Sequence, residues 1–212
     1  TVPLTLTFND LSMLYGWQTV RYENFNAYQE EIKRTVTAGE KLTFDSLKEL
    51  IIRVNNSMVE IALKEVHDNP SGFTFKTLRT LFSNVYLVEG WLDAYQQAVS
   101  EARANGELTA AEVKTIIETV NQEKQKLERQ LALDFILSNL DTFTSDDLER
   151  AGFWQAANDY AEYIEQFRAA IKEKVLADGT ELTYEEVNAL IYQVINEIKQ
   201  GMTADVLEII NT

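Results

Sequence analysis

The chain contains no cysteine, one histidine, two prolines and eight glycines among its 212 residues. Without cysteine it has no disulfide scaffold, no thiolate zinc site, no iron–sulfur cluster and no cysteine nucleophile. The single imidazole, His67, excludes motifs that need two, such as the H-E-x-x-H zinc site. Scarce proline and glycine argue against collagen, flexible linkers and a turn-rich β-sandwich. These absences remove thiol chemistry, cysteine-ligated metals and two-histidine metal motifs from the functions to be considered.

Long apolar runs and an excess of basic residues are also missing. Pure apolar runs such as Leu50-Ile51-Ile52 are far shorter than the roughly 18–20 residues that span a bilayer. Nineteen basic against 34 acidic residues give a net charge of −15, which repels a phosphate backbone and an anionic membrane surface. We therefore expect no nucleic-acid partner and no membrane insertion.

The residues that are present are typical of a folded protein, with 45% hydrophobic and 25% charged residues. A chain of this length buries a sizeable core without metals or cross-links. No linker-like stretch interrupts it, so we expect one all-α domain over residues 1–212.

An internal repeat organises the sequence. Three sites share an apolar residue, a threonine and a leucine four residues after the threonine: Leu6-Thr7 with Leu11, Phe73-Thr74 with Leu78, and Phe143-Thr144 with Leu148. An amphipathic stretch follows each site and ends at Gly39, Gly106 or Gly179, after which Leu-Thr and a second amphipathic stretch appear. Because the copies differ in length, the pattern indicates a diverged triplication with copies near 1–72, 73–137 and 138–212.

Apolar residues in these stretches recur at helical spacing, as in Leu78, Leu81, Phe82 and Val85. Capping boxes at Thr109–Glu112 and Thr183–Glu186 mark helix starts, and the three glycines mark helix ends. The expected helices are 8–37, 43–68, 74–104, 109–138, 144–177 and 183–200, with a short segment near 203–211. Each copy is then an αα-hairpin, and three hairpins form either a six-helix bundle or a short α-solenoid-like stack.

Few residues suggest chemistry. His67 stands at a predicted helix end, where an imidazole favours the negative helix terminus, so a structural role is expected. Lys64 occupies the position that a Glu-x-x-His carboxylate metal motif requires, which removes the di-iron interpretation. The segment Asn105–Glu112 resembles the second half of an EF-hand loop, but Arg103 stands where a ligand oxygen belongs. Calcium at this loop is the less favoured alternative to a simple helix end and start.

Aromatic residues are concentrated in the three first-helix segments. Packing inside the core is the favoured interpretation, and an aromatic surface for subunits or an apolar ligand is the alternative. The candidate interface or ligand residues are Trp17, Tyr22, Trp91, Trp154, Tyr160 and Tyr163.

Acidic charge is uneven: residues 138–212 carry 15 acidic and 5 basic side chains, a balance of −10. A solvated face is the default explanation, and a basic partner is the alternative.

Without a catalytic set, the sequence favours a non-enzymatic structural or protein-interaction protein, a subunit of an extracellular, surface or particle assembly. Its partner would be a second copy or another protein, and no cofactor or catalytic residue is expected. The alternative is a carrier of an apolar small molecule, lipid or pigment held between aromatic helices. Localisation stays open, although a chain without cysteine slightly favours a secreted or particle-associated protein.

Overall fold

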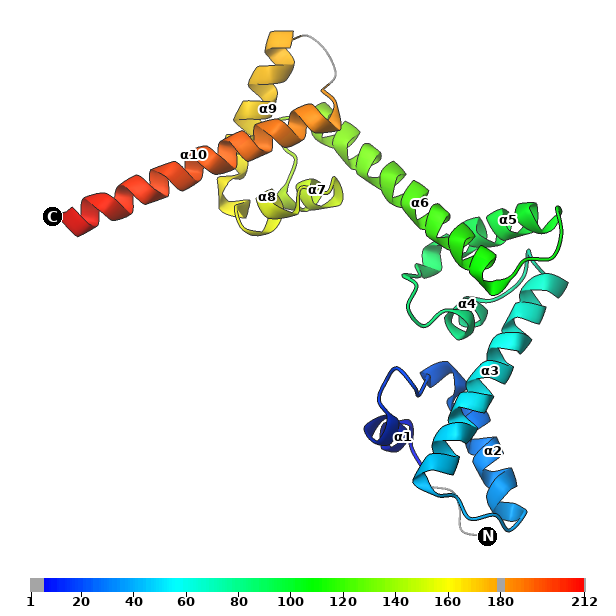
Figure 1. The fold of residues 1–212 in the computed structure, drawn as a ribbon. Helices are drawn as coiled ribbons and strands as arrows, with labels where there is room; N and C mark the ends of the chain where they lie inside the picture. The colour runs from blue at the N-terminus through cyan, green and yellow to red at the C-terminus, as the bar shows by residue number, and fades with distance from the viewer. Residues whose placement is uncertain (1–5, 179–181, 212) are drawn as a thin grey trace. The chain divides into compact units, whose positions relative to one another are not determined.

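The computed structural model describes residues 6–178 and 182–211, and for 178 and 206–211 it describes the backbone alone. These residues form α-helices, 3-10 turns and loops, with no strand among them. The α-helices are α1 (Phe8–Tyr15), α2 (Phe25–Thr37), α3 (Phe44–Asp68), α4 (Phe75–Leu81), α5 (Leu92–Arg103), α6 (Ala110–Ser138), α7 (Ser145–Arg150), α8 (Trp154–Asn158), α9 (Ile164–Asp178) and α10 (Tyr184–Asn211), as Figure 1 shows. The 3-10 turns are η1 (Tyr22–Asn24), η2 (Glu89–Trp91) and η3 (Ala161–Tyr163).

The chain divides into two compact units, unit 1 (Thr1–Gln122) and unit 2 (Glu123–Thr212), and the division falls inside α6. In unit 1, α2 lies alongside the first half of α3, and α4 packs against α3 (Figure 1). In unit 2, α9 packs against α10, and α7 packs against α8. Among the described residues, no helix is long and apolar enough to cross a membrane.

Threonine side chains begin the helices that the sequence marks. At Thr109 the hydroxyl accepts from the backbone N–H of Glu112 at 3.3 Å, and the Glu112 carboxylate accepts from the Thr109 N–H at 2.7 Å. The same reciprocal pair joins Thr183 and Glu186, so both predicted capping boxes are confirmed. The bonds from Thr109 lower the pKa of Glu112, because they stabilise its ionised form.

The expectation of continuous first helices over 8–37, 74–104 and 144–177 is wrong. The first breaks at Gly16, whose φ of 77° lies in a region that favours glycine. The second breaks at Phe82, which is extended at φ −130° and ψ 102°. The third breaks at Gly152, with φ 93°. Each break is followed by a 3-10 turn that starts the longer helix α2, α5 or α9.

Helix ends agree with the sequence at two of the three marking glycines. Gly39 and Gly106 have φ values of 85° and 145°, which side chains other than glycine rarely adopt. Gly179 lies outside the described residues. The separate segment expected near 203–211 is wrong, because α10 runs without a break through Gly201.

Three hydrophobic cores hold the described residues together. The first and second cores lie in unit 1, around Tyr28 and Tyr95, and the third lies in unit 2, around Phe167. The long helix α3 contributes to two of them: Leu50 and Ile51 pack in the first core, whereas Ala62 and Val66 pack in the second. Helix α6 is divided in the same way, with Val113, Ile117 and Val120 in the second core and Ala132, Leu133 and Ile136 in the third. Each core boundary therefore falls in the middle of a long helix.

A tyrosine–asparagine hydrogen bond joins two helices in each of the first two cores. Tyr28, the fourth residue of α2, donates its hydroxyl hydrogen to Asn55 Oδ1, and Asn55 is the twelfth residue of α3. Tyr95, the fourth residue of α5, donates to Oδ1 of Asn121, the twelfth residue of α6, at 2.6 Å. Burial raises the pKa of both tyrosines, so their hydroxyl groups keep the proton that they donate.

The third core has apolar residues at both of these positions. Phe167 is the fourth residue of α9 and Ile195 is the twelfth of α10, and both are buried. A lone polar residue at either position would be buried without its partner, which costs more than replacing both partners together. Donor and acceptor are thus present together or absent together.

A side-chain bond to a backbone carbonyl is also found at a matching place in each of the three cores. The residue after Tyr28, Gln29, donates through Nε2 to the carbonyl oxygen of Leu6 at 3.0 Å. The residue after Tyr95 does the same to Phe73 at 2.7 Å, and Arg168 donates through Nε to the carbonyl oxygen of Phe143 at 2.9 Å. Each accepting residue directly precedes a capping threonine, so each bond ties the start of a short helix to a longer one.

The Tyr95–Asn121 pair predicts a coupled stability effect. Tyr95→Phe removes the donor to Asn121 and the acceptor for the Val88 N–H, which bonds the hydroxyl at 3.2 Å. We expect this variant to lose about 1–3 kcal/mol of unfolding free energy, measured by equilibrium urea denaturation. The double variant Tyr95→Phe/Asn121→Ile should lose less than the sum of the two single losses.

The control is Tyr192→Phe, which removes the hydroxyl of a tyrosine that is 52% exposed. Its unfolding free energy should stay close to that of the unmodified chain. Strictly additive losses in the double variant would show that Tyr95 and Asn121 do not act as a unit.

An ion-pair network joins α2 to α3 and lowers the pKa of Glu31. Glu31 accepts from Arg34 Nη2 at 2.6 Å and from Arg53 Nη2 at 2.9 Å, and these cations lower its pKa from the ordinary 4.5 to about 2. Because the pKa is lower in the folded state, the stabilisation is complete above about pH 4.5 and is lost as the pH falls toward 2.

A carboxyl ¹³C titration by NMR measures this pKa directly. Arg34 makes the larger contribution, so Arg34→Gln should raise the pKa of Glu31 further than Arg53→Gln does. The reverse order would show that the bond across to α3, not the bond within α2, dominates.

Candidate functional site

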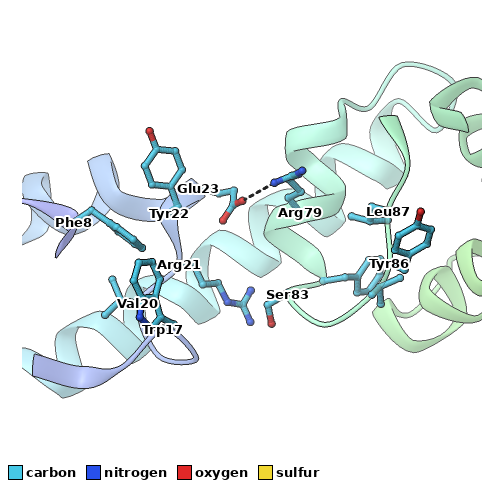
Figure 2. A pocket seen from close by; sticks show the side chains of 12 residues that line it. Phe8, Trp17, Val20, Arg21, Tyr22, Glu23, Arg79, Ser83, Tyr86 and Leu87 are labelled. Atoms are coloured by element: carbon cyan, nitrogen blue, oxygen red, sulfur yellow. Dashed lines mark ion pairs between the residues drawn. The ribbon is translucent and has the colours of Figure 1, made fainter. Parts of the chain in front are cut away.

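A groove with a volume of about 510 Å³ lies on unit 1 (Figure 2). Most of its lining is apolar or aromatic, with two arginines and one glutamate among the polar residues. The lining residues are Phe8, Trp17, Val20, Arg21, Tyr22, Glu23, Arg79, Phe82, Ser83, Val85, Tyr86 and Leu87. We call this the aromatic groove. It is built where both breaks in the first helices of unit 1 occur, after α1 and after α4.

The first wall follows the break at Gly16. The chain turns there, with the Thr19 and Val20 N–H groups both donating to the Gly16 carbonyl at 3.1 Å, instead of continuing α1. The turn leaves Trp17 72% exposed. Phe8 on α1 holds the exposed rings in place, since its ring centroid lies 5.4 Å from that of Trp17 and 5.3 Å from that of Tyr22, both edge to face.

The second wall is the loop after α4. Phe82 is buried in the second core, and its backbone is extended, so the chain after it does not continue along the axis of α4. Asn121 Nδ2 donates to the carbonyl oxygen of Tyr86 at 2.7 Å, and Tyr95 fixes the Val88 N–H. The same buried pair that joins α5 to α6 therefore positions this loop, on which the Tyr86 ring is 65% exposed.

Two polar contacts connect the walls. Arg21 Nη1 donates to the carbonyl oxygen of Thr80, the residue before the end of α4, at 2.7 Å. Arg79 lies across from Glu23, with a nitrogen-to-oxygen distance of 3.8 Å, as the dashed line in Figure 2 marks. The Arg79 guanidinium also lies 5.0 Å from the centre of the Phe75 ring. These contacts set the distance between the two sets of exposed rings.

The residue types of the groove are those that dominate binding energy in protein interfaces. Tryptophan, tyrosine and arginine are enriched at interface hot spots, because they combine large apolar area with directed polar groups. Trp17, Tyr22 and Tyr86 are each at least 65% exposed. Single exposed aromatic side chains are common on protein surfaces, but several gathered in one place are unusual. The groove is therefore the candidate functional site of the described residues.

Two of the six sequence-predicted candidates, Trp17 and Tyr22, line this groove. Trp91 is half-buried and packs against the second core. Trp154 is 59% exposed on α8 of unit 2. Tyr160 and Tyr163 are half-buried against the third core, with ring centroids 6.3 Å apart.

Sequence reasoning missed Phe8, Arg21, Arg79 and Tyr86 as candidate site residues. Gly16 was a local signal for the first wall, because a glycine inside a helical pattern marks a turn. No comparable signal marks Arg21 and Arg79, which reach the groove through contacts between distant parts of the chain.

The remaining chemical candidates have structural partners. His67 Nε2 lies 2.6 Å from the carbonyl oxygen of Leu108, so the imidazole joins the end of α3 to the loop before α6. The Glu112 carboxylate, the last oxygen ligand of the calcium alternative, caps α6 through Thr109. In the part of the chain that the structure describes, no three histidine or carboxylate side chains are grouped to hold a metal ion.

Comparison with known proteins assigns no family. The chain matches no protein-family model, and neither a curated protein nor a solved structure is significantly similar to it.

The contact between Phe8 and Trp17 leads to a prediction about the mobility of the Trp17 ring. Phe8→Ala removes the ring that holds Trp17, so Trp17 should gain mobility. In a chain labelled with 5-fluorotryptophan, we expect the ¹⁹F resonance of Trp17 to shift and narrow, while those of Trp91 and Trp154 stay in place.

The matched control is Phe44→Ala, which removes a 55% exposed ring that packs on Tyr15 at 4.7 Å. It should leave the Trp17 resonance unchanged. An unchanged Trp17 resonance in Phe8→Ala would mean that the turn after Gly16 holds the ring without Phe8.

Proposed function

We propose that the chain is a non-enzymatic protein-interaction protein, a structural subunit of an extracellular, surface or particle assembly, and that the aromatic groove of unit 1 is its contact surface. The observation that carries this proposal is the gathering of Trp17, Tyr22 and Tyr86, three highly exposed rings, in one groove. Exposing aromatic surface to water costs free energy, and this cost is recovered when a partner covers the surface.

The proposal includes a chain built as three diverged copies of one helical hairpin. It is supported by the three bonds to Leu6, Phe73 and Phe143, which occur at the same position of each copy. The 3-10 turns η1, η2 and η3 support it as well, since each directly precedes the helix that carries the bonding residue. Repeating a supersecondary unit extends the surface available for contacts without adding catalytic groups, which fits an interaction protein.

The carrier of an apolar small molecule is less well supported. Tyr28, Tyr95 and Phe167 are fully buried at the centres of the three cores, where a carrier would hold its ligand. The aromatic groove is lined partly by charged groups and joins the surface, so an apolar ligand there would stay in contact with water.

The proposal predicts association that depends on the groove rings. We expect the full chain to form oligomers in native mass spectrometry and in sedimentation velocity without added ligand. The variant Trp17→Ala/Tyr86→Ala should weaken that association by at least about tenfold, because hot-spot aromatics each contribute that much.

The control is Tyr192→Ala, which removes a 52% exposed ring in unit 2 and should leave association unchanged. A bare monomer at every concentration would contradict the assembly proposal. A monomer that carries a small organic mass would favour the carrier instead.

A further inference from the structure

The aromatic groove has an excess of positive charge in a chain whose net charge is −15. Its lining contains Arg21 and Arg79 against the single carboxylate of Glu23. The Arg79 side chain is 55% exposed, whereas that of Glu23 is 22% exposed, so the cation is the group that a partner meets first. Their separation of 3.8 Å is too long for a hydrogen bond, so the pair leaves guanidinium donors available.

Unit 2 contains an acidic segment with an exposed tryptophan. The segment 145–163, which includes α7 and α8, contains five acidic side chains and one basic one: Asp146, Asp147, Glu149, Asp159 and Glu162, with Arg150. The Asp147 side chain is 13% exposed and caps α7 through Thr144, so Asp146, Asp159 and Glu162 are the exposed carboxylates. Asp159 and Glu162 are exposed, and Trp154 between α7 and these carboxylates is 59% exposed. We call this segment the acidic tryptophan surface.

The two surfaces complement each other in charge and in apolar character. An indole inserted between the rings of the groove would gain apolar contact at both faces, and carboxylates beside it would meet Arg79 and Arg21. Pairing two grooves would bring Arg79 against its own copy, and pairing two acidic tryptophan surfaces would oppose carboxylates. Like charges at an interface suppress such pairings, so the unlike pairing is favoured.

We infer that the occupant of the groove is the acidic tryptophan surface of a second copy of this chain, so that copies associate head to tail. This inference rests on the proposed function and names the partner. Because the aromatic groove and the acidic tryptophan surface are different parts of the chain, the contact is heterologous: it continues from copy to copy and ends only by closing into a ring.

A mixing experiment on the full chain tests this arrangement. The groove variant is Trp17→Ala/Tyr86→Ala, and the acidic-surface variant is Trp154→Ala/Asp159→Lys. Each variant alone should associate at least about tenfold more weakly than the unmodified chain in sedimentation velocity. An equimolar mixture should form a 1:1 dimer that grows no further, because one groove and one acidic tryptophan surface remain intact.

Two further measurements separate this contact from misfolding and from other contacts. Arg79→Glu keeps every groove ring and should weaken association as the groove variant does, while Tyr192→Ala should not. Circular dichroism checks that each variant retains the helical content of the unmodified chain. Association of the unmodified chain should weaken as salt is raised, because exposed charges at the contact are screened.

The outcomes distinguish the inference from the proposed function. If the groove variant loses association but the acidic-surface variant keeps it, the groove pairs with a different surface, so the head-to-tail inference fails and the proposed function stands. If neither variant affects the oligomers, the groove is not the contact surface and both fail. A monomeric unmodified chain overturns both as well.

Discussion

Shared long helices are the constraint on which the rest of the structure depends. Helix α3 packs Leu50 and Ile51 into the first core and Ala62 and Val66 into the second. A straight helix fixes the separation and rotation of the residues along it, at about 1.5 Å and 100° per residue. The two cores of unit 1 therefore cannot move independently without bending α3. The aromatic groove lies where the elements of these two cores come together, with Val20 from the first and Phe82 from the second among its lining.

The buried pair of Tyr95 and Asn121 contributes both to the packing of the second core and to the geometry of the groove. Tyr95 and Asn121 fasten α5 to α6, and the same two side chains bind the backbone at Val88 and Tyr86. Buried polar groups of this kind contribute modestly when paired and cost more when left unpaired. The backbone of the loop that carries Tyr86 is thus fastened to the second core at two points.

Sequence patterns predicted the long helices well, because their signals are local. Helix α3 was expected over 43–68 and spans Phe44–Asp68, and α6 was expected over 109–138 and spans Ala110–Ser138. Threonine caps and apolar periodicity lie within a few residues of each other, so they can be read along the chain. The prediction of continuous first helices was wrong, because the helical spacing of apolar residues continues across Gly16, Phe82 and Gly152, where the backbone is not helical.

The groove could be predicted only in part, because its charged groups are placed by contacts across the fold. Arg21 bonds the Thr80 carbonyl 59 residues away, and such a partner has no signature in periodicity or spacing. Trp17 and Tyr22 were found as unusual aromatics, yet their exposure follows from the turn at Gly16 and the edge-to-face packing on Phe8.

The third core differs from the other two in its packed side chains but has a comparable bond between helices. Phe167 and Ile195 form an apolar pair where the other cores have a tyrosine and an asparagine, and Arg168 bonds the Phe143 carbonyl where the other cores use a glutamine. The two facing core positions require side chains that fill the space between the helices and that are both polar or both apolar. A tyrosine with an asparagine meets this requirement, and so does a phenylalanine with an isoleucine. The carbonyl bond needs a donor of sufficient reach, which restricts the position to side chains with terminal N–H groups. The three cores therefore differ in the polarity of their packed side chains, whereas all three keep a side-chain bond to the carbonyl that precedes a capping threonine.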